Sequence, residues 1–462
     1  MHDKNHYEGA GSIKSKFEER MMKRIGVYMA IAVIVLLAGT VGWLYFADYL
    51  DLEKPVVKLN ENIVAIGKKK EIGITFADSA SGLSRLTIEI VQDNKPRIIA
   101  EESFPSRGVR QKAIRLTLDT EALKLKNGQA VINIKAVDCS LFKNETLLAT
   151  QVKIDTVPLQ ISVLNPVNYI NQGGTGFITY RTSKPTTLTG VYVDDKFFPG
   201  HTILINNRPT SVACFALAMD AANAKTKIAI WARDDAGNEA RSAMPYAIKP
   251  KKFRSDKVNL SDTFLQNIMP GFQSSTPQLQ GKSAVDVFAY VNGTLREENT
   301  KTIQALCSKS VNKRLWEGPF LRMRDAKPMA LFGDQRTYLI SGKSYGTSVH
   351  LGVDLASTAH APVEAANHGI VVFAGPLGIY GNAVIIDHGL GLFSLYGHLS
   401  SIETAVGKTV KKEEKIGVSG MTGLAGGDHL HFSILAGGQF VNPQEWWDPH
   451  WIEDNVMKKM AI

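Results

Sequence analysis

Cysteine is scarce in this sequence, and no two cysteines are spaced as a metal-binding or redox pair. The 462 residues include three, Cys139, Cys214 and Cys307, with no C-x-x-C pair among them. An odd number at wide spacing argues against a complete disulfide framework and against a cysteine-based zinc site. We expect three small buried thiols, although an oxidising compartment would also allow a Cys139–Cys214 disulfide.

One metal-binding motif is also missing. There is no H-E-x-x-H string, which excludes the helical zinc site of many metalloproteases.

Positive charge is unevenly distributed along the chain. The net charge is +9, yet from Arg336 onward there are 8 Lys and Arg against 11 Asp and Glu, so the excess of positive charge lies in the first 335 residues. Because it lacks interleaved aromatics or a basic helix, we expect no nucleic-acid partner. An anionic envelope polymer, a membrane surface or solvent alone fits this charge equally well.

Charge is also absent from one long apolar run. Residues 25–47 form 23 consecutive uncharged residues, preceded by a cluster of Lys and Arg. At ~1.5 Å per residue the run can cross a ~30 Å hydrocarbon core as a helix. The positive-inside rule places residues 1–24 in the cytoplasm and everything after Asp48 across the membrane. A cleavable signal peptide is the main alternative, but the run is too long for one and no A-x-A-like site follows it.

Short alternating apolar runs, broken by Gly, Asn, Asp and Pro, fill the next two hundred residues. They are typical of strands with one buried face, so the chain is predicted to be mainly β. A weak repeat near 95 residues relates 131–138 to 228–235, and the turn after residue 232 resembles bacterial immunoglobulin-like modules. We expect two such β-sandwiches, 53–156 and 157–250, which act as a spacer rather than as a ligand-binding unit.

A connector at 251–324 has a different pattern. Apolar residues recur at helical spacing in 260–272 and 284–306, with Pro270 and Pro277 as breakers. This predicts a helical connector, which either links the domains or lies over a cleft in the last one.

Histidine is concentrated near the end of the chain. Eight of the eleven histidines lie between residues 350 and 450. Three short strings stand out: His350-Leu-Gly-Val-Asp354, Tyr396-Gly-His398-Leu-Ser and His429-Leu-His431-Phe. Residues two or four apart in an extended segment point to one face, so two adjacent strands could deliver several ligands to one point.

Zinc chemistry fits such a set. A catalytic zinc takes about three His or carboxylate ligands and keeps one position open for water. Two histidines and one aspartate leave the site net positive, which lowers the pKa of a bound water toward ~7. Without H-E-x-x-H the base must come from elsewhere, and a neutral histidine is suitable.

The region from about Met329 to Trp447 resembles the LytM-type, lysostaphin-like metallopeptidases of family M23, which hydrolyse peptide bonds in bacterial cell-wall peptidoglycan. The family pairs an H-x-x-x-D string with a later H-x-H string, and both are intact. Other matching strings occur in the same order: Ala361-Pro-Val, Gly369-Ile-Val-Val-Phe-Ala-Gly, Gly381-Asn-Ala-Val-Ile-Ile-Asp-His-Gly, Tyr396-Gly-His-Leu-Ser and Gly417-Val-Ser-Gly-Met-Thr-Gly. The resemblance implies an antiparallel-β LytM-type peptidase domain at 325–462.

Carried over residue by residue, the resemblance assigns one Zn²⁺ to His350, Asp354 and His431. It gives His398 and His429 the catalytic roles of orienting or deprotonating the water and stabilising the oxyanion, without saying which histidine does which. Relatives often carry an arginine near the cleft where this chain has Arg336, which suggests a substrate role.

The remaining polar residues of this region have ordinary interpretations. We expect His388 to be structural, and His360, His368 and His450 to lie on the surface or in loops. Asp428 is either a supporting partner of the metal site or a solvated loop acid.

These features lead to a membrane-anchored zinc endopeptidase that cuts peptidoglycan from the periplasmic side of a bacterial inner membrane. One alternative is a non-catalytic LytM-like regulator that activates another wall hydrolase, although such modules have typically lost metal ligands. A soluble cytoplasmic binding protein is a third, and requires the apolar run to be neither anchor nor signal. Relatives can also carry inhibitory segments upstream, so the connector 251–324 is a candidate cover for the cleft.

Overall fold

The computed structural model describes residues 9–105, 107–165 and 167–461, with backbone alone for 9–17. Its secondary structure is 43% strand and 20% helix, which confirms a mainly β chain. The chain forms two compact units. Unit 1 comprises residues 1–157 with 235–238, and unit 2 comprises 158–234 with 239–462.

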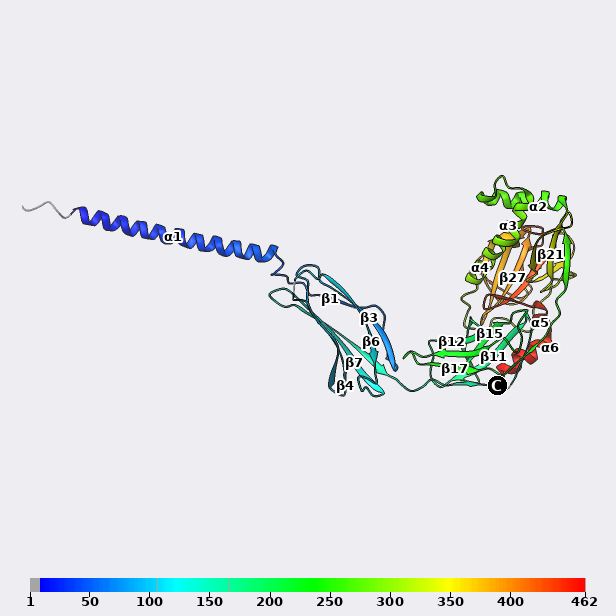
Figure 1. Ribbon diagram of the computed structural model, residues 1–462, viewed down its shortest axis with the longest axis horizontal. Coiled ribbons are helices and arrows are strands. Elements are labelled where there is room, and N and C mark those ends of the chain that lie inside the picture. The colour runs from blue at the N-terminus through cyan, green and yellow to red at the C-terminus, as the bar shows by residue number, and fades with distance from the viewer. Residues whose placement is uncertain (1–8, 106, 166, 462) are drawn as a thin grey trace, which may run out of the picture. The chain divides into compact units, whose positions relative to one another are not determined.

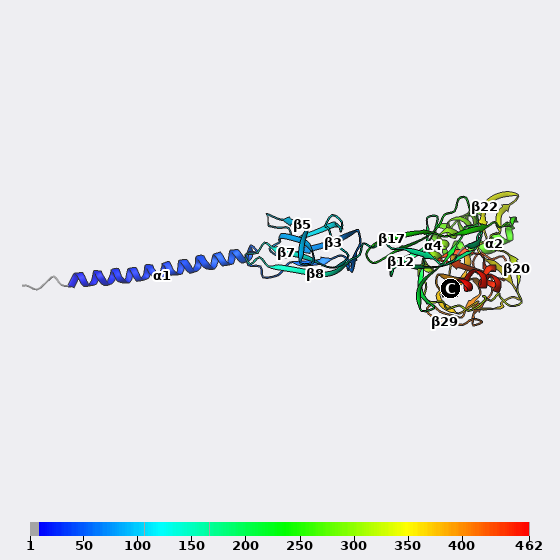
Figure 2. The same cartoon turned by 90° about the horizontal axis from the view of Figure 1, so that it is seen from below.

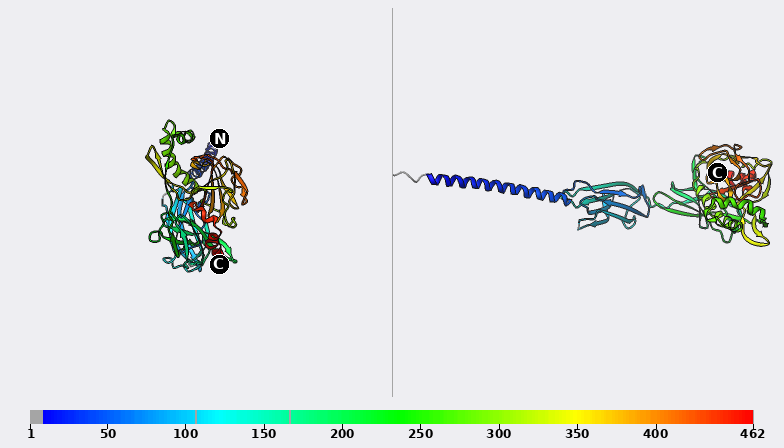
Figure 3. Two further views of the ribbon diagram at one scale, coloured as in Figure 1. Left: turned by 90° about the vertical axis from the view of Figure 1, so that its right-hand side faces the viewer. Right: turned by 90° about the horizontal axis from the view of Figure 1, so that it is seen from above.

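Helix α1 (Gly9–Phe46) contains the apolar run. It begins before residue 25, so the charged residues that precede the run continue the same helix. The stretch Glu18–Phe46 has a mean hydropathy of 2.3 and is long and apolar enough to cross a membrane. None of its most apolar window is buried (Figure 3).

Unit 1 is a sandwich of two sheets (Figure 2). Alternate apolar residues of each strand face its core, as in β7, where Ala130, Ile132, Ile134 and Ala136 are buried. The three-stranded sheet has the order β1 (Val56–Leu59), β3 (Lys69–Ala77), β6 (Gln111–Asp119). The five-stranded sheet has the order β2 (Ala65–Ile66), β8 (Glu145–Ile154), β7 (Gly128–Asp138), β4 (Leu83–Gln92), β5 (Lys95–Ser103). The immunoglobulin-like character of this module stays a prediction.

Unit 2 begins with a second pair of four-stranded sheets. One has the order β14 (His201–Ile205), β15 (Arg208–Ala216), β11 (Thr175–Thr182), β9 (Ile161–Val163). The other has the order β13 (Lys196–Pro199), β12 (Leu188–Val193), β16 (Ile228–Arg233), β17 (Glu239–Ala243). A short parallel pair, β10 (Asn168–Asn171) and β18 (Tyr246–Lys249), closes one end.

The C-terminal part of unit 2 is built on a large antiparallel sheet, as expected. Its order is β20 (Lys327–Ala330), β23 (Val353–Ala356), β31 (Leu430–Ala436), β27 (Leu392–Leu399), β26 (Asn382–Gly389), β25 (Gly369–Pro376), β29 (Thr409–Val410), with β32 (Gln439–Val441) also paired to β31. The one-turn η3 (Gly378–Tyr380) precedes β26, and a small sheet adds β24 (Pro362–Glu364), β30 (Lys415–Val418) and β28 (Ser401–Ile402). The central strands β26, β27 and β31 are buried on both faces, so apolar residues occupy positions on both, and the polar residues among them, such as His398 and His431, are buried as well.

The connector lies beside this sheet (Figure 1). It starts with a strand rather than a helix: β19 (Ser255–Asn259) pairs in parallel with β21 (Gln335–Ile340), which in turn pairs with β22 (Lys343–Val349). Helical elements follow: α2 (Asp262–Ser275), η1 (Pro277–Leu279), α3 (Ala284–Tyr290), η2 (Val291–Leu295) and α4 (Arg296–Leu306).

Pro270 does not break α2, contrary to the expectation from the sequence. Proline removes the hydrogen bond to the carbonyl four residues earlier, that of Gln266, but both residues are exposed. Solvent can therefore satisfy that carbonyl while Leu265, Met269 and Phe272 hold the helix against the core. The helix ends at Ser275, before Pro277.

The second sandwich packs against the end of the chain. The last helical turns are α5 (Pro443–Trp447), α6 (Pro449–Ile452), η4 (Glu453–Met457) and α7 (Lys458–Met460). Glu445 accepts hydrogen bonds from Asn171 Nδ2 and the Thr175 backbone N–H, both at 2.7 Å. Lys459 Nζ donates to the Phe177 carbonyl oxygen at 2.8 Å. The sandwich, the connector and the C-terminal sheet thus form one compact unit.

All three cysteines are free. Cys214 and Cys307 are buried, as expected, whereas Cys139 is partly exposed because it follows β7 at the end of the first sandwich. Cys139 lies in unit 1 and Cys214 in unit 2.

Burial raises the pKa of Glu445 from its ordinary value of 4.5 to about 7. The folded chain therefore keeps a proton that the unfolded chain loses, and the free energy of unfolding falls as pH rises from 4.5 through 7, by up to about 3 kcal/mol. We expect Glu445→Gln to flatten this dependence in urea unfolding followed by tryptophan fluorescence. Glu453→Gln, a change at an exposed acid, should keep the wild-type slope, and equal slopes for all three proteins would contradict the prediction.

Candidate metal centre

Three neighbouring strands bring the predicted residues together. In the order β23, β31, β27, Asp354 is the register partner of His431, and His431 is the register partner of Gly397, next to His398. Antiparallel pairing therefore joins three strings that are far apart in sequence. His350 is not in a strand; it follows β22 in an irregular segment and is held by backbone hydrogen bonds to Gly333 and Asp334.

The predicted ligands converge on one point. His350 Nε2 lies 2.9 Å from Asp354 Oδ1 and 3.1 Å from His431 Nδ1, and His431 Nδ1 lies 3.0 Å from the same carboxylate oxygen. The histidine rings are 94–95% buried. Gly352 is required for this approach, because a Cβ there would lie 2.6 Å from the His431 ring. His350, Asp354 and His431 thus meet as the sequence predicts.

Hydrogen bonds on the far side of each ring fix which nitrogen faces the centre. His350 Nδ1 donates to the Leu331 carbonyl oxygen at 2.9 Å, which leaves a lone pair on Nε2. His431 Nε2 donates to Ser433 Oγ at 2.9 Å, because the Ser433 hydroxyl itself donates to the Leu351 carbonyl. The lone pair of His431 is then on Nδ1. Both inward-facing nitrogens are acceptors in this assignment, and this is the arrangement of metal-bound histidines.

A metal ion fits this donor set. Two nitrogen lone pairs and a carboxylate oxygen within 3.1 Å of one another repel unless a cation lies between them. The three side chains supply the number and the types of ligand that a catalytic zinc site uses. Their ligand atoms all lie within 4.8 Å of one another, close enough to bind one ion.

Asp354 contacts both the other predicted ligands and a positively charged side chain. Arg336 Nη2 donates to its other oxygen, Oδ2, at 3.3 Å. Burial raises the pKa of Asp354, but its close contacts with His350, His429 and His431 outweigh burial and hold it well below the ordinary value. Asp354 is therefore an anion at all physiological pH values, as a metal ligand must be.

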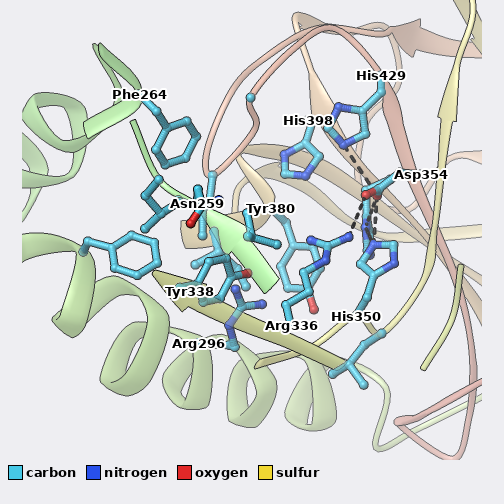
Figure 4. Close-up of a pocket in the computed structure, with 18 of the residues that line it drawn as sticks. Asn259, Phe264, Arg296, Arg336, Tyr338, His350, Asp354, Tyr380, His398 and His429 are labelled. Carbon is cyan, nitrogen blue, oxygen red and sulfur yellow. Dashed lines mark hydrogen bonds and ion pairs between the residues drawn. The ribbon is translucent and has the colours of Figure 1, made fainter. Parts of the chain in front are cut away.

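The two candidate catalytic histidines lie side by side next to the ligands. The ring centroids of His398 and His429 are 4.8 Å apart, and His429 Nε2 is 3.5 Å from Asp354 Oδ1 (Figure 4). His398 Nδ1 donates to the Thr422 carbonyl and His429 Nδ1 to the Gly427 carbonyl, each at 2.8 Å. Each ring is thereby oriented through Nδ1, which leaves Nε2 for chemistry.

Their protonation preferences differ. Burial, followed by the charges of His429 and His431, lowers the pKa of His398 to about 3, so this ring is neutral. Burial also acts against the proton on His429, but the hydrogen bond and charge of Asp354 raise its pKa above the ordinary value.

A distortion in β27 aims His398 into the centre. Two residues, Gly397 and His398, stand opposite Ala383 alone on β26, and His398 has a φ of 63°. A bulge turns a side chain that would otherwise follow the sheet alternation. A non-glycine residue at positive φ is strained, and such strain is concentrated at functional sites.

The centre opens into a cavity of 490 Å³, within the size range of ligand pockets. Phe264, Asn259 and Arg296 from the connector face the histidines across it (Figure 4). The connector therefore forms a wall of the cleft without filling it.

The other polar residues behave as the sequence suggests. His388 is buried, and hydrogen bonds at 2.7 Å link its two nitrogens to the His368 carbonyl and Ser394 Oγ. His360 and His450 are exposed. Asp428 accepts hydrogen bonds from Ser419 Oγ and the His360 backbone N–H, so it supports a loop rather than a metal ligand.

Sequence reasoning missed several members of the site. Ser433 and the Leu331 carbonyl orient the ligands, Tyr380 lies 5.3 Å from the His431 ring, and Arg296 comes from the connector. The sequence could have indicated Ser433, because a residue two positions after His431 in a strand lies on the same face. The other residues reach the site through tertiary contacts, which no local pattern in the sequence indicates.

We expect Ser433→Ala to weaken zinc binding about 10–100-fold, because His431 Nε2 loses the acceptor that fixes its tautomer. Competition against a chromophoric chelator measures this affinity. Ser394→Ala is the matched control, since it makes the same change beside His388, outside the centre, and should leave the affinity unchanged. Wild-type affinity in Ser433→Ala would contradict the tautomer assignment.

Known proteins resemble the C-terminal part of this chain. The model of peptidase family M23 matches residues 348–443. The "DD-carboxypeptidase/endopeptidase Mpg" of Neisseria meningitidis is 44% identical over 95 residues, which are 21% of this chain and 22% of that protein. The "Murein hydrolase activator EnvC" of Escherichia coli is 37% identical over 95 residues, 21% of this chain and 23% of that protein.

Among solved structures, the catalytic domain of the antimicrobial peptidase lysostaphin from Staphylococcus simulans is 27% identical, with 28% of this chain and 98% of that one covered and a TM-score of 0.24. The chain spans only about a fifth of the length of the curated relatives it matches. The matched segment contains all five predicted histidine and aspartate residues and the strands that carry them. Residues 348–443 are therefore a peptidase family M23 domain.

Proposed function

We propose that this protein is a membrane-anchored zinc metalloendopeptidase that hydrolyses peptide bonds in cell-wall peptidoglycan. The observation that carries the proposal is the convergence of His350 Nε2, Asp354 Oδ1 and His431 Nδ1, with His398 and His429 beside them in one open cavity. A regulatory module needs no such set of ligand atoms.

A relative of the peptidase domain and the N-terminal helix together support peptidoglycan as the substrate class. A relative with 44% identity over the matched region is named a DD-carboxypeptidase/endopeptidase. Helix α1 has the length and hydropathy of a signal-anchor, and we assign it that role in the bacterial inner membrane. The two units would then lie in the periplasm, where peptidoglycan is found.

His350, Asp354 and His431 would hold the zinc, which when bound supplies Lewis acidity and an acidified water. Arg336 keeps the Asp354 carboxylate oriented through Oδ2, so that Oδ1 is free to bind the metal. His398 and His429 each present Nε2 to the cavity, where a histidine can accept the proton of the attacking water or donate to the developing oxyanion.

The connector gives the cleft a second, different wall. Opposite the histidines it contributes the apolar ring of Phe264 and the guanidinium of Arg296. A peptide in the cavity would meet metal and histidines on one side and these residues on the other. We assign this wall a role in positioning the substrate, since a 490 Å³ cavity remains beside it.

A second candidate function is activation of another wall hydrolase, because one relative of similar identity is named a murein hydrolase activator. The complete ligand set favours the enzyme, since an activator that acts through protein contacts has no use for a metal site. The two functions are separated by whether the purified protein alone cuts the polymer.

We expect the full chain, purified in neutral detergent and loaded with one zinc, to release peptide fragments from purified peptidoglycan. His431→Ala should release none, because it removes one of three ligands. His360→Ala, at an exposed histidine outside the cavity, is the matched control and should retain wild-type activity. Chromatography of the soluble products measures both. No fragments from wild type, or equal release by His431→Ala, would exclude the enzyme.

His398→Gln should lower the turnover number about 10²–10⁴-fold while zinc content stays at one per chain, because the residue handles protons without binding the metal. Metal analysis and product release on the same preparation separate these effects. His388→Gln, a change at a buried histidine outside the cavity, should not produce this specific combination. Loss of zinc in His398→Gln would instead make His398 a ligand.

A further inference from the structure

Three aspartates meet at one end of the first sandwich, far from the zinc centre in sequence. Asp51 lies in the segment between α1 and β1, Asp78 directly follows β3, and Asp138 ends β7. One carboxylate oxygen of each lies within 4.8 Å of the others. The side chains come from three separate segments, so the fold of unit 1 gathers them.

This cluster carries negative charge without a neutralising partner. Asp78 and Asp138 are 4% and 0% exposed, and within the described ranges none of the three carboxylates forms an ion pair with a Lys, Arg or His. Two other buried aspartates are compensated: Asp234 pairs with Lys184 at 2.8 Å and Asp334 with Arg254 at 2.9 Å. Like charges this close in a buried site repel strongly, and a cation would remove the repulsion.

The hydrogen bonds that the cluster does receive come from neutral donors. Asp78 Oδ1 accepts from the Gly82 N–H at 2.6 Å. Asp138 accepts from Ser140 Oγ at 2.8 Å and from Asn144 Nδ2 at 2.7 Å. These bonds orient the carboxylates but supply no positive charge.

A buried hydroxyl beside the cluster has no partner. Ser81 is 3% exposed, and its Oγ makes no hydrogen bond in the structure. Its backbone N–H donates to Asp51 Oδ2 at 3.1 Å, which places Ser81 beside the cluster. A buried oxygen without a hydrogen-bond partner lowers the stability of the fold. The presence of the Ser81 hydroxyl next to three carboxylates therefore points to a ligand that the hydroxyl and the carboxylates would bind together.

We propose that Asp51, Asp78, Asp138 and Ser81 form a calcium-binding site. All of the ligand atoms are oxygens, which favours a hard cation over zinc. Calcium takes six to eight oxygen ligands in flexible geometry, so carboxylates from three segments, a hydroxyl and water suit it better than the strict octahedron of Mg²⁺.

The site would fasten the membrane helix to the first sandwich. Asp51 belongs to the short segment that follows α1, while Asp78 and Asp138 belong to the two facing sheets. The same segment is already held by Arg107, which donates to the carbonyl oxygens of Ala47 and Asp48. Bound calcium would therefore order the connection between the membrane anchor and the extracytoplasmic chain, independently of the peptidase centre.

Calorimetric titration of the zinc-loaded full chain in neutral detergent tests the proposal. We expect one Ca²⁺ per chain with a dissociation constant on the order of 10⁻⁴–10⁻³ M or below, and weaker binding of Mg²⁺. Asp78→Asn should weaken Ca²⁺ binding at least about tenfold, since it removes one ligand charge. The same variant should raise the unfolding temperature of the calcium-free protein, because it relieves the repulsion; a variant that merely damages the fold would lower it.

Two further variants complete the design. Ser81→Ala removes only the hydroxyl and should weaken Ca²⁺ binding without lowering the calcium-free unfolding temperature. Glu61→Gln removes a charge from an exposed residue of the same sandwich and should bind Ca²⁺ like wild type. No saturable binding up to about 10 mM Ca²⁺, tighter binding of Mg²⁺, or equal affinities of Asp78→Asn and Glu61→Gln would overturn the proposal. His431→Ala should bind Ca²⁺ normally, so failure of the zinc peptidase would leave this site standing.

Discussion

The rest of the site depends on the meeting of two imidazole lone pairs and one carboxylate oxygen within 3.1 Å. Such a contact between acceptors is unfavourable in itself, and the protein maintains it by fixing each ring from behind. The Leu331 carbonyl and the Ser433 hydroxyl take the outward N–H groups, so neither histidine can turn a proton toward the centre without losing a buried hydrogen bond. A cation converts this repulsion into binding energy.

The antiparallel sheet makes the arrangement possible. Pairing of β23 with β31 places Asp354 opposite His431, and pairing of β31 with β27 brings the bulge at His398 alongside. These strands are buried on nearly every side, which keeps the ligands from following solvent motions. His350 is the exception, since it lies outside the sheet and relies on hydrogen bonds to the 331–334 segment.

Local patterns were enough to predict much of this. The apolar run and the alternating strands depend only on neighbours in sequence, and they predicted α1 and the mainly β fold. The spacing of the histidine strings indicated only that adjacent strands could bring several ligands together, and the choice of His350, Asp354 and His431 came from the resemblance to family M23. Pro270 shows the limit of such rules, because its exposed position let tertiary packing continue the helix. The packing of the second sandwich on Glu445 and Lys459, and the place of Arg296 in the cleft wall, bring together residues that only the fold makes neighbours.

The chain would then bind two cations of different chemistry. Zinc would occupy the centre with two nitrogen ligands, where the reaction takes place, and calcium would occupy the all-oxygen site that joins the membrane helix to the first sandwich. Crystals of the zinc-loaded protein, measured above and below the zinc absorption edge, test the zinc centre most directly. We expect one strong anomalous peak bonded to His350 Nε2, Asp354 Oδ1 and His431 Nδ1. A peak elsewhere, or one bonded to His431 through Nε2, would contradict it.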